Sequence, residues 1–313
     1  MAKFEISVMP PLIGSPSIGS TNARNILRNA RLADQLGFNA ILLQDLIGIE
    51  GAETNDCLVT LGAVAAITKR VRVGTLATPL PLRHPAFVAK AMATVGRISS
   101  ARAILTVGAG WVKDDFEWYG LRYEGFMTRI KMMEEGIRFI KACWRNGKAD
   151  FQGKFFKLSE PDLQPKPVQR PRPPIWVAGV SDEALKIAVR EGDGWFGWRG
   201  IDPKRFSLRV RLVDSLCRTA GRRRSDVKNA MRMQVSIARD QDSLRRQAGK
   251  WMNLTESKDP HSMISYGTPS YFVDLLQGYS DAGANHVNVV FVPVVKSPEQ
   301  LKLFAKKVLP HFR

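Results

Sequence analysis

Short apolar runs alternate with longer amphipathic segments along most of this chain. Residues 22–36 place apolar side chains three and four positions apart, and Gly37 follows them, which is typical of a helix and its end. The apolar run that comes next, at 40–43, is typical of a buried strand. Because parallel strands need crossover connections, which are usually helices, repetition of this unit predicts a parallel α/β fold.

The alternation predicts eight strands. They are expected at residues 4–9, 40–43, 71–76, 103–107, 175–178, 194–197, 231–238 and 287–292. Helices are expected at 22–36, at 56–68, after 84–85, at 126–144, after 203 and at 298–308. Eight strand-and-helix units in 313 residues match a TIM (β/α)8 barrel more closely than a doubly wound sheet. No change of composition marks a boundary, so residues 1–313 are expected to form a single domain.

Residues 240–267 break the alternation, because they are polar and only partly helical in pattern. A long stretch of this kind is typical of a functional loop rather than of a further repeat unit. We therefore predict an insertion segment that lies over the C-terminal mouth of the barrel and is a candidate lid.

Two of the expected strands end in glycine-containing turns. The first turn is Gly108, Ala109 and Gly110, and the second begins at Gly179, with Ser181 at the N-cap position of a helix. Glycine allows a ligand to approach backbone N–H groups closely, and a helix N-terminus favours an anion. Either turn alone is also explained by ordinary turn or capping chemistry. Because both lie at the face where TIM-barrel sites form, together they predict a phosphate cradle.

Other polar and aromatic residues follow the expected strands at the same face. Asp45 comes after the second strand, and the segment 74–79 includes the end of the third. Trp111, Trp118 and Trp198 could wall a site for a flat ring, although packing alone explains any one of them.

The chain is strongly basic, with 47 lysine and arginine residues against 29 aspartate and glutamate residues and a formal charge of +18 at pH 7. The basic residues are scattered, and their densest run, at 222–224, lies in an expected loop. No zinc-ligand spacing, heptad repeat or RNA-binding aromatic motif accompanies them. We therefore expect no nucleic-acid partner, and we expect the positive surface to attract an anionic cofactor or substrate.

Composition places the chain among soluble globular proteins, with 44% hydrophobic and 24% charged residues. No apolar run approaches the roughly 20 residues that cross a bilayer, and the first residues lack a secretory pattern. Cys57, Cys143 and Cys217 lie far apart in the sequence, so they imply neither a disulfide framework nor a metal site. We expect a cytoplasmic protein with no metal and no membrane partner.

A series of short motifs runs in order along nearly the whole chain. They are VRVGT at 71–75, HP at 84–85, VGAGW at 107–111, FQGKFF at 151–156, PKPVQ at 165–169, PPIWVAG at 173–179, GDGW at 192–195, YGTP at 266–269 and DAGA at 281–284. Each motif is weak, but the ordered set resembles the bacterial luciferase-like monooxygenase superfamily. The resemblance implies a TIM barrel, commonly dimeric, that binds reduced FMN or the deazaflavin coenzyme F-420 at its mouth.

The tryptophan-containing glycine turn looks most like the deazaflavin-dependent branch of this superfamily. In that branch the cofactor ring rests against a bulge after the third strand, often with a non-proline cis peptide bond. The matching residues here are Thr75, Leu76 and Ala77. The phosphate-binding positions carry over to Gly108, Ala109 and Gly110, and to Gly179, Val180 and Ser181.

The chain departs from the superfamily pattern after the second strand. Many relatives carry an Asp-His pair there, whereas this chain has Asp45 followed by Leu46. Asp45 is our candidate catalytic residue, as a polar contact to the ring or the substrate. His84 enters an expected helix and is expected to act as a structural cap, and neither His261 nor His286 has motif support.

The resemblance implies an oxidoreductase that uses F-420 or a flavin to transfer hydride to or from a small organic substrate. The cofactor supplies the redox chemistry, and the barrel orients its ring and excludes water. Two alternatives stay open. One is an FMN-dependent luciferase-like monooxygenase, and the other, suggested by the missing histidine, is a non-catalytic protein that binds a flavin or deazaflavin. A homodimer is expected in each case.

Overall fold

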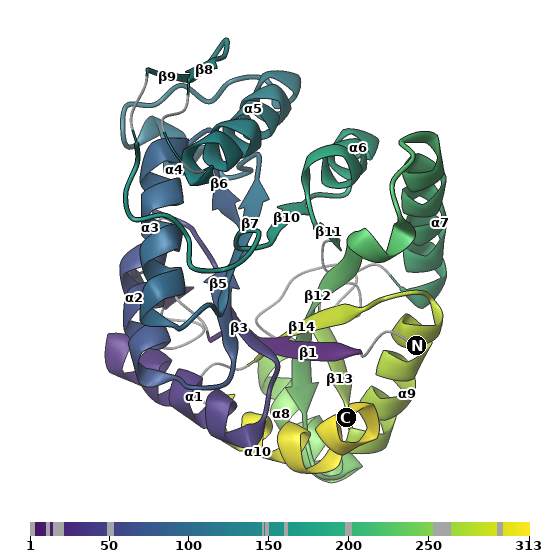
Figure 1. The fold of residues 1–313 in the computed structure, drawn as a ribbon. Helices are drawn as coiled ribbons and strands as arrows, with labels where there is room; N and C mark the ends of the chain where they lie inside the picture. The colour runs from purple at the N-terminus through teal and green to yellow at the C-terminus, as the bar shows by residue number, and fades with distance from the viewer. Residues whose placement is uncertain are drawn as a thin grey trace.

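The barrel consists of eight parallel strands that close into a ring (Figure 1). The computed structural model describes residues 4–10, 13–14, 22–48, 53–145, 147, 150–159, 162–197, 202–252, 264–292 and 297–313. In chain order the barrel strands are β1 (Glu5–Val8), β3 (Ala40–Leu43), β5 (Arg72–Thr75), β7 (Ala103–Gly108), β10 (Ile175–Ala178), β11 (Gly194–Gly197), β12 (Lys228–Ile237) and β14 (His286–Phe291). Each strand pairs with the next, and β14 pairs with β1. The predicted TIM barrel is confirmed.

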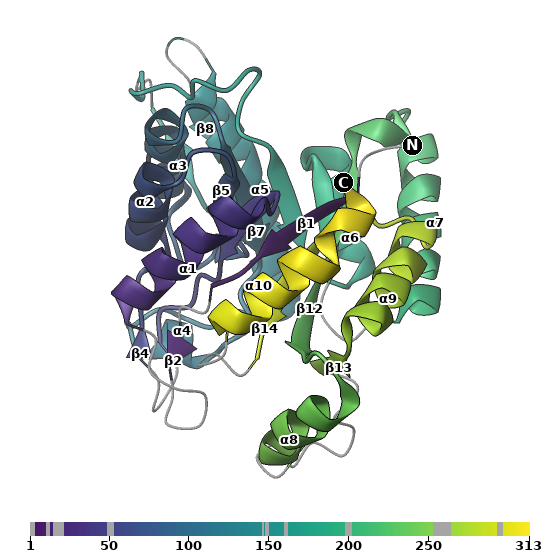
Figure 2. The same ribbon diagram turned by 90° about the horizontal axis from the view of Figure 1, so that it is seen from below.

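Helices surround the barrel (Figures 1 and 2). They are α1 (Ala23–Leu36), α2 (Cys57–Ile67), α3 (Pro85–Ile98), α5 (Phe126–Trp144), α6 (Asp182–Glu191), α7 (Pro203–Thr219), α9 (Pro269–Asp281) and α10 (Ser297–Lys307). Side-chain caps begin several of them, among them Asn22 before α1 and Asp56 before α2. None of the helices within the described ranges is long and apolar enough to cross a membrane.

Shorter elements extend the barrel at its ends. They are the pairs β2 (Ile13–Gly14) with β4 (Glu53–Thr54) and β8 (Phe151–Gln152) with β9 (Lys157–Leu158), the single strands β6 (Thr78–Pro79) and β13 (Ile264–Gly267), the helices α4 (Asp114–Glu117) and α8 (Gln241–Met252), and the 3-10 turns η1 (Arg224–Asp226) and η4 (Leu309–Phe312). Among these, α4 follows the C-terminal end of β7 and α8 follows that of β12.

Two apolar layers hold the barrel together. The larger lies between the strands and the outer helices. The smaller is made of Met9, Ala40, Leu42, Leu76, Ile104, Trp176, Phe196, Ala230 and Val290. These residues lie at alternating positions of the strands, so they fill the inside of the ring. The barrel is therefore a packed core rather than a pore.

The N-terminal end of the barrel interior, which we call the foot, holds a network of five polar side chains. Glu5 pairs with Arg72 and contacts Nδ1 of His286 at 3.2 Å. The Oγ of Ser7 lies 2.6 Å from Nε2 of His286 and accepts an amide N–H from Asn288 at 2.8 Å. Burial lowers the pKa of His286. We therefore assign a neutral ring that donates from Nδ1 to Glu5 and accepts the Ser7 hydroxyl at Nε2.

The segment predicted as an insertion, 240–267, contains two regular elements. Strand β13 pairs with the last four residues of β12 and continues the barrel wall outward, so this part is strand rather than lid. The side chain of Gln247 on α8 donates to Ser236 Oγ at 2.6 Å. Figure 2 shows α8 on the side of the barrel where α4, β2 and β4 also lie. Residues 253–263 lie outside the described residues, and a lid there stays a prediction.

Candidate active site at the barrel mouth

The chain forms an irregular bulge directly after β5. The peptide bond between Leu76 and Ala77 is cis, at the position that the resemblance implies. Beyond this bond β6 pairs with the end of β7. Thr75 is fully buried beneath the bulge, where its hydroxyl donates to the Thr106 carbonyl at 2.8 Å. The Leu76 N–H donates to the Leu43 carbonyl at 2.7 Å, which ties the bulge to β3.

A cavity of about 440 Å³ opens at the C-terminal ends of the strands. Its lining includes both glycine turns, the bulge and Asp45. Every predicted site residue except the buried Thr75 therefore borders one cavity. The remaining lining residues are Gln44, Leu46, Pro79, Trp111, Asp115, Phe126, Ile130, Ala178, Ala184 and Arg232. Two segments 70 residues apart in the sequence, at Gly108 and Ala178, thus meet at this mouth because β7 pairs with β10.

The first glycine turn presents backbone N–H groups to the cavity. Gly110 has φ +72°, and a Cβ atom there would lie 2.7 Å from the Phe116 ring. Glycine is therefore required both by the backbone conformation and by the space. The N–H groups of Ala109 and Gly110 have no protein acceptor among the described residues. The Arg129 guanidinium holds the turn from behind, since its Nε donates to the Gly110 carbonyl at 3.3 Å.

In the second glycine turn, only part of the backbone is available to a phosphate, whereas the prediction assigned the whole turn to it. The Gly179 N–H donates to the Phe196 carbonyl at 3.1 Å, so it completes the barrel wall. Gly179 has φ +154°, and a Cβ there would lie 2.7 Å from Cβ of Ala184. The N–H groups of Val180 and Ser181 have no protein acceptor in the described part of the chain. The Ser181 side chain caps α6 through the Ala184 N–H at 3.2 Å.

The carboxylate of Asp45 is buried and faces Arg83. The Nε of Arg83 lies 3.1 and 3.0 Å from the two oxygens, and Nη2 lies 2.9 Å from one of them. The same Nη2 is 2.7 Å from Asp56. Burial raises the pKa of Asp45, and the facing guanidinium opposes that rise. Burial of Arg83 acts to lower its pKa, but the two carboxylates raise it. Because the guanidinium bonds both oxygens, we assign an ionised pair.

Two charged residues that sequence reasoning missed also line the cavity, Asp115 and Arg232. Asp115 accepts the N–H groups of Ile47 at 3.1 Å and Gly48 at 2.7 Å, so it joins the loop after β3 to the loop after β7. Burial raises the pKa of Asp115. Arg232 is 7% exposed and lies on β12. A charged residue between two methionines of an expected barrel strand was the available signal for Arg232.

Several other residues considered from the sequence lie elsewhere. His84 caps α3, with Nδ1 accepting the Ala86 N–H at 3.2 Å, as expected of a structural residue. His286 belongs to the foot network. Trp111 borders the cavity and is 58% exposed. Trp198 and His261 lie outside the described residues.

The fold and the mouth define a TIM-barrel protein whose strand ends frame a cavity with backbone donors for an anion and a bulge against which a flat group can rest. The family model of the luciferase-like monooxygenases matches residues 3–284. The chain belongs to this family, as the sequence predicts.

Relatives in this family include dehydrogenases and monooxygenases. The chain is 27% identical over 311 residues to an F420-dependent glucose-6-phosphate dehydrogenase of Microbacterium testaceum, covering 90% of this chain and 91% of that protein. It is 32% identical over 169 residues to an FMNH(2)-dependent dimethylsulfone monooxygenase of Pseudomonas putida, covering 53% and 46%. Among solved structures, an F420-dependent secondary alcohol dehydrogenase in complex with an F420-acetone adduct superposes with a TM-score of 0.84 at 20% identity and covers 99% of both chains.

Proposed function

We propose that the chain is an oxidoreductase that binds F-420 or FMN in the mouth cavity and moves hydride between the cofactor and a small organic substrate. The observation that carries this proposal is the convergence of two backbone turns and the cis bulge on one cavity. The dehydrogenase relative, which matches nine-tenths of the chain, supports the deazaflavin more than FMN.

The residues at the mouth fit a phosphate attached to a flat ring. The N–H groups of Ala109, Gly110, Val180 and Ser181 would hold the phosphate, helped by the positive end of α6. The bulge at 75–77 would support one face of the ring. The bound group supplies the hydride chemistry, while the chain orients it and keeps water away.

Asp45 is proposed as the polar contact to the ring or substrate. The Arg83 guanidinium contacts both oxygens of this carboxylate, whose side chain is fully buried, so the ion pair fixes Asp45 where it borders the cavity. Leu46, next to it, is apolar and buried, so it cannot take part in proton transfer.

We also propose that the protein is a cytoplasmic homodimer. Helix α2 is apolar on all sides, yet Val59 is 76% exposed on it, and Phe87 on the adjacent α3 is 75% exposed. A helix without a polar face is normally covered, and a second copy of this chain would cover it. Sedimentation velocity of the wild type and of a Val59→Glu/Phe87→Glu variant tests this proposal, because the variant should be monomeric. The three buried free cysteines suit a reducing compartment.

Titration of the apo protein with F-420 and with FMN, followed by fluorescence, tests the proposed function. We expect saturable binding of F-420 and turnover of a panel of alcohols and aldehydes or ketones under anaerobic conditions. Binding of neither cofactor would contradict the proposal. The monooxygenase relative makes oxygenation the second candidate, and product formation that requires both reduced FMN and oxygen would select it. Cofactor binding without any turnover would select a binding protein.

A further inference from the structure

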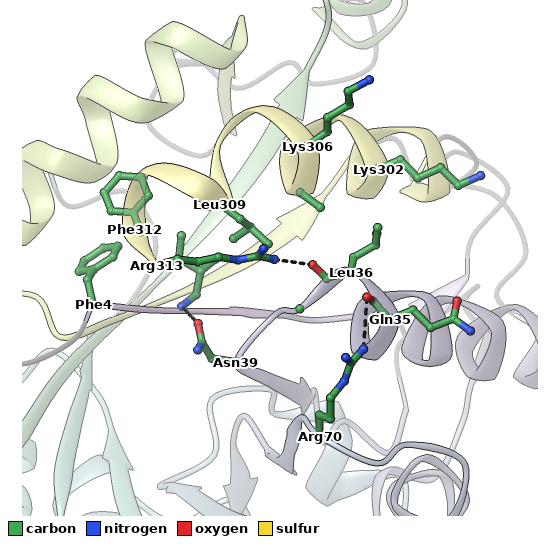
Figure 3. Close-up of a pocket in the computed structure, with 13 residues that line it drawn as sticks. Phe4, Gln35, Leu36, Asn39, Arg70, Lys302, Lys306, Leu309, Phe312 and Arg313 are labelled. Carbon is green, nitrogen blue, oxygen red and sulfur yellow. Dashed lines mark hydrogen bonds between the residues drawn. The ribbon is translucent and has the colours of Figure 1, made fainter.

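We propose that a second pocket, at the opposite end of the barrel, binds an organic phosphate with an aromatic part. The pocket has a volume of about 560 Å³ and lies between the C-terminal end of α1, the loop before β5 and the helical end of the chain at α10 and η4 (Figure 3). Its volume falls within the range of small-molecule sites. It borders the starts of β1 and β3, so an occupant there does not compete for the mouth.

Two guanidinium groups of the pocket are held in place by the end of α1. Arg70 Nη2 donates to the carbonyls of Asp34 at 2.7 Å and Gln35 at 3.3 Å. Arg313 Nη2 donates to the Leu36 carbonyl at 2.8 Å. In each arginine, Nη2 caps the C-terminal end of α1 and has its acceptors there. Within the described residues, Nε and Nη1 of both have no protein acceptor, so a planar set of donors is positioned for an anion.

Two lysines add to this charge from the other side of the pocket. Lys302 and Lys306 lie four residues apart on α10 and line the pocket, and in Figure 3 both side chains extend outward from the helix. These lysines do not cap α1, because neither donates to a carbonyl of that helix among the described residues. None of the four cations of the pocket forms an ion pair within 4 Å in the part of the chain that the structure describes, although the charge of Arg70 lowers the pKa of the nearby Asp34. A phosphate dianion would offset this repulsion.

The positive charge continues beyond the pocket. An adjoining groove of about 620 Å³ shares Gln35 and Lys302 with it and carries Arg24, Arg28 and Arg31 along α1. Its lining contains one carboxylate, that of Glu299. By contrast, the arginines at 222–224, the densest basic run in the sequence, are neutralised locally, with Arg223 paired to Asp226 and Arg224 to Asp214. Unneutralised charge therefore continues from this pocket along α1.

The remaining wall of the pocket is apolar and partly aromatic. The rings of Phe4 and Phe312 lie with centroids 5.2 Å apart, and Leu309 lies beside them (Figure 3). Inorganic phosphate would occupy only the cationic side. An aromatic phosphate monoester fits both walls, because its ring packs on the phenylalanines while its phosphate meets the arginines and lysines.

Calorimetric titration with phenyl phosphate tests the proposal. We expect one site per chain in the wild type, and a Kd about tenfold higher in the Lys302→Ala/Lys306→Ala variant, since two exposed charge contacts together contribute about 1.4 kcal/mol. The control variant Lys131→Ala/Lys204→Ala removes the same charge from exposed positions on α5 and α7, and its Kd should equal that of the wild type. A Phe312→Ala variant should bind phenyl phosphate more weakly and inorganic phosphate unchanged.

Four outcomes would overturn the proposal. The first two are the absence of phenyl phosphate binding to the wild type and an equal Kd in the pocket variant and its control. The third is loss of phenyl phosphate binding in a Gly179→Val variant, which would place the ligand at the mouth. The fourth is a pocket variant that binds duplex DNA more weakly but phenyl phosphate as the wild type does, which would indicate a nucleic-acid surface.

Discussion

The foot and the mouth of the barrel differ in whether their polar groups have partners within the protein. At the foot, Glu5, Arg72, His286 and Ser7 bond one another across three strands. At the mouth, Asp45 and Asp115 are also paired, but backbone N–H groups of the two turns border a cavity and have no protein acceptor among the described residues. Because buried or confined polar groups require partners, the unbonded N–H groups of the mouth favour a ligand there, whereas the ionisable side chains of the foot are already paired with one another.

The carboxylates of the two ends show the same contrast. Burial of Glu5 acts to raise its pKa, but His286 and Arg72 lower it to about 2. At the mouth, burial raises the pKa of Asp45 even though Arg83 faces it. Ionised Glu5 thus stabilises the folded state, whereas burial of ionised Asp45 costs free energy. Such a perturbed carboxylate is typical of a functional position.

Breaking the ion pair at the mouth should have the largest effect. An Arg83→Met variant leaves Asp45 buried without its guanidinium, so we expect a loss of about 3 kcal/mol in the free energy of unfolding. The double variant Asp45→Asn/Arg83→Met should recover most of this loss, because no buried charge remains unpaired. Urea denaturation of both variants measures the difference, and equal stability of the two would contradict it.

Closing the cradle should have the next largest effect. A Gly179→Val variant places side-chain atoms against Ala184 and should weaken cofactor binding about a hundredfold, since a strained backbone costs roughly 2–3 kcal/mol. Gly108→Ala is the matched control, because its Cβ meets Ala77 at an ordinary 3.5 Å. Gly108→Val tests the larger side chain there and should also weaken binding. Fluorescence titration gives the affinities. Unchanged binding in folded Gly108→Val and Gly179→Val variants would contradict the proposal that the two turns bind the phosphate.

Removing the charge at the foot should have a smaller effect that depends on pH. The pKa of Glu5 is lower in the folded state than in the unfolded chain, so its contribution is complete above about pH 4.5 and is lost as the pH falls through about 2. We expect Glu5→Gln to cost about 2 kcal/mol at pH 7, after allowance for its partial exposure. Denaturation at pH 7 and pH 3 should show that the difference in free energy of unfolding between the wild type and this variant becomes smaller in acid. A difference that grows in acid would contradict the lowered pKa of Glu5.

The smallest expected effect concerns the rate of cofactor capture. The positive surface should speed association of F-420, whose phosphate and glutamate tail are anionic, by a few-fold at low salt. Stopped-flow fluorescence across ionic strength measures this dependence. A salt-independent rate together with tight binding of duplex DNA at physiological salt would favour nucleic acid as the reason for the charge.

Much of the fold could be predicted because local signals agreed with it. The strands at 40–43, 175–178 and 194–197 and the helix at 126–144 have the predicted bounds, since apolar runs there end at clear polar, glycine or proline positions. Strand β13 was missed because it follows a polar stretch and is held by β12. Helix α9 was missed although Phe272, Leu276 and Tyr279 recur at helical spacing.

The candidate site could be predicted only as far as its backbone. The glycine turns have sequence signals, and the cis bond lies in the segment that the family resemblance indicated. The pairing of Asp45 with Arg83 joins residues 38 apart, and the bond from Gly179 to Phe196 depends on strand register, so neither has a local signal. Asp115 was missed because its role as an acceptor for Ile47 and Gly48 exists only in the folded barrel.

The pairing of β1 with β14 has a consequence for how the protein is made on the ribosome. Glu5 and His286 are 281 residues apart, so the first barrel strand is synthesised long before the strand that completes its hydrogen bonding. Until then β1 pairs with β3 alone and exposes an edge and a charged side chain that belongs inside. Ring closure is thus the most nonlocal step of folding, and it can occur only after β14 has been synthesised, so a slow and aggregation-exposed interval is expected before it.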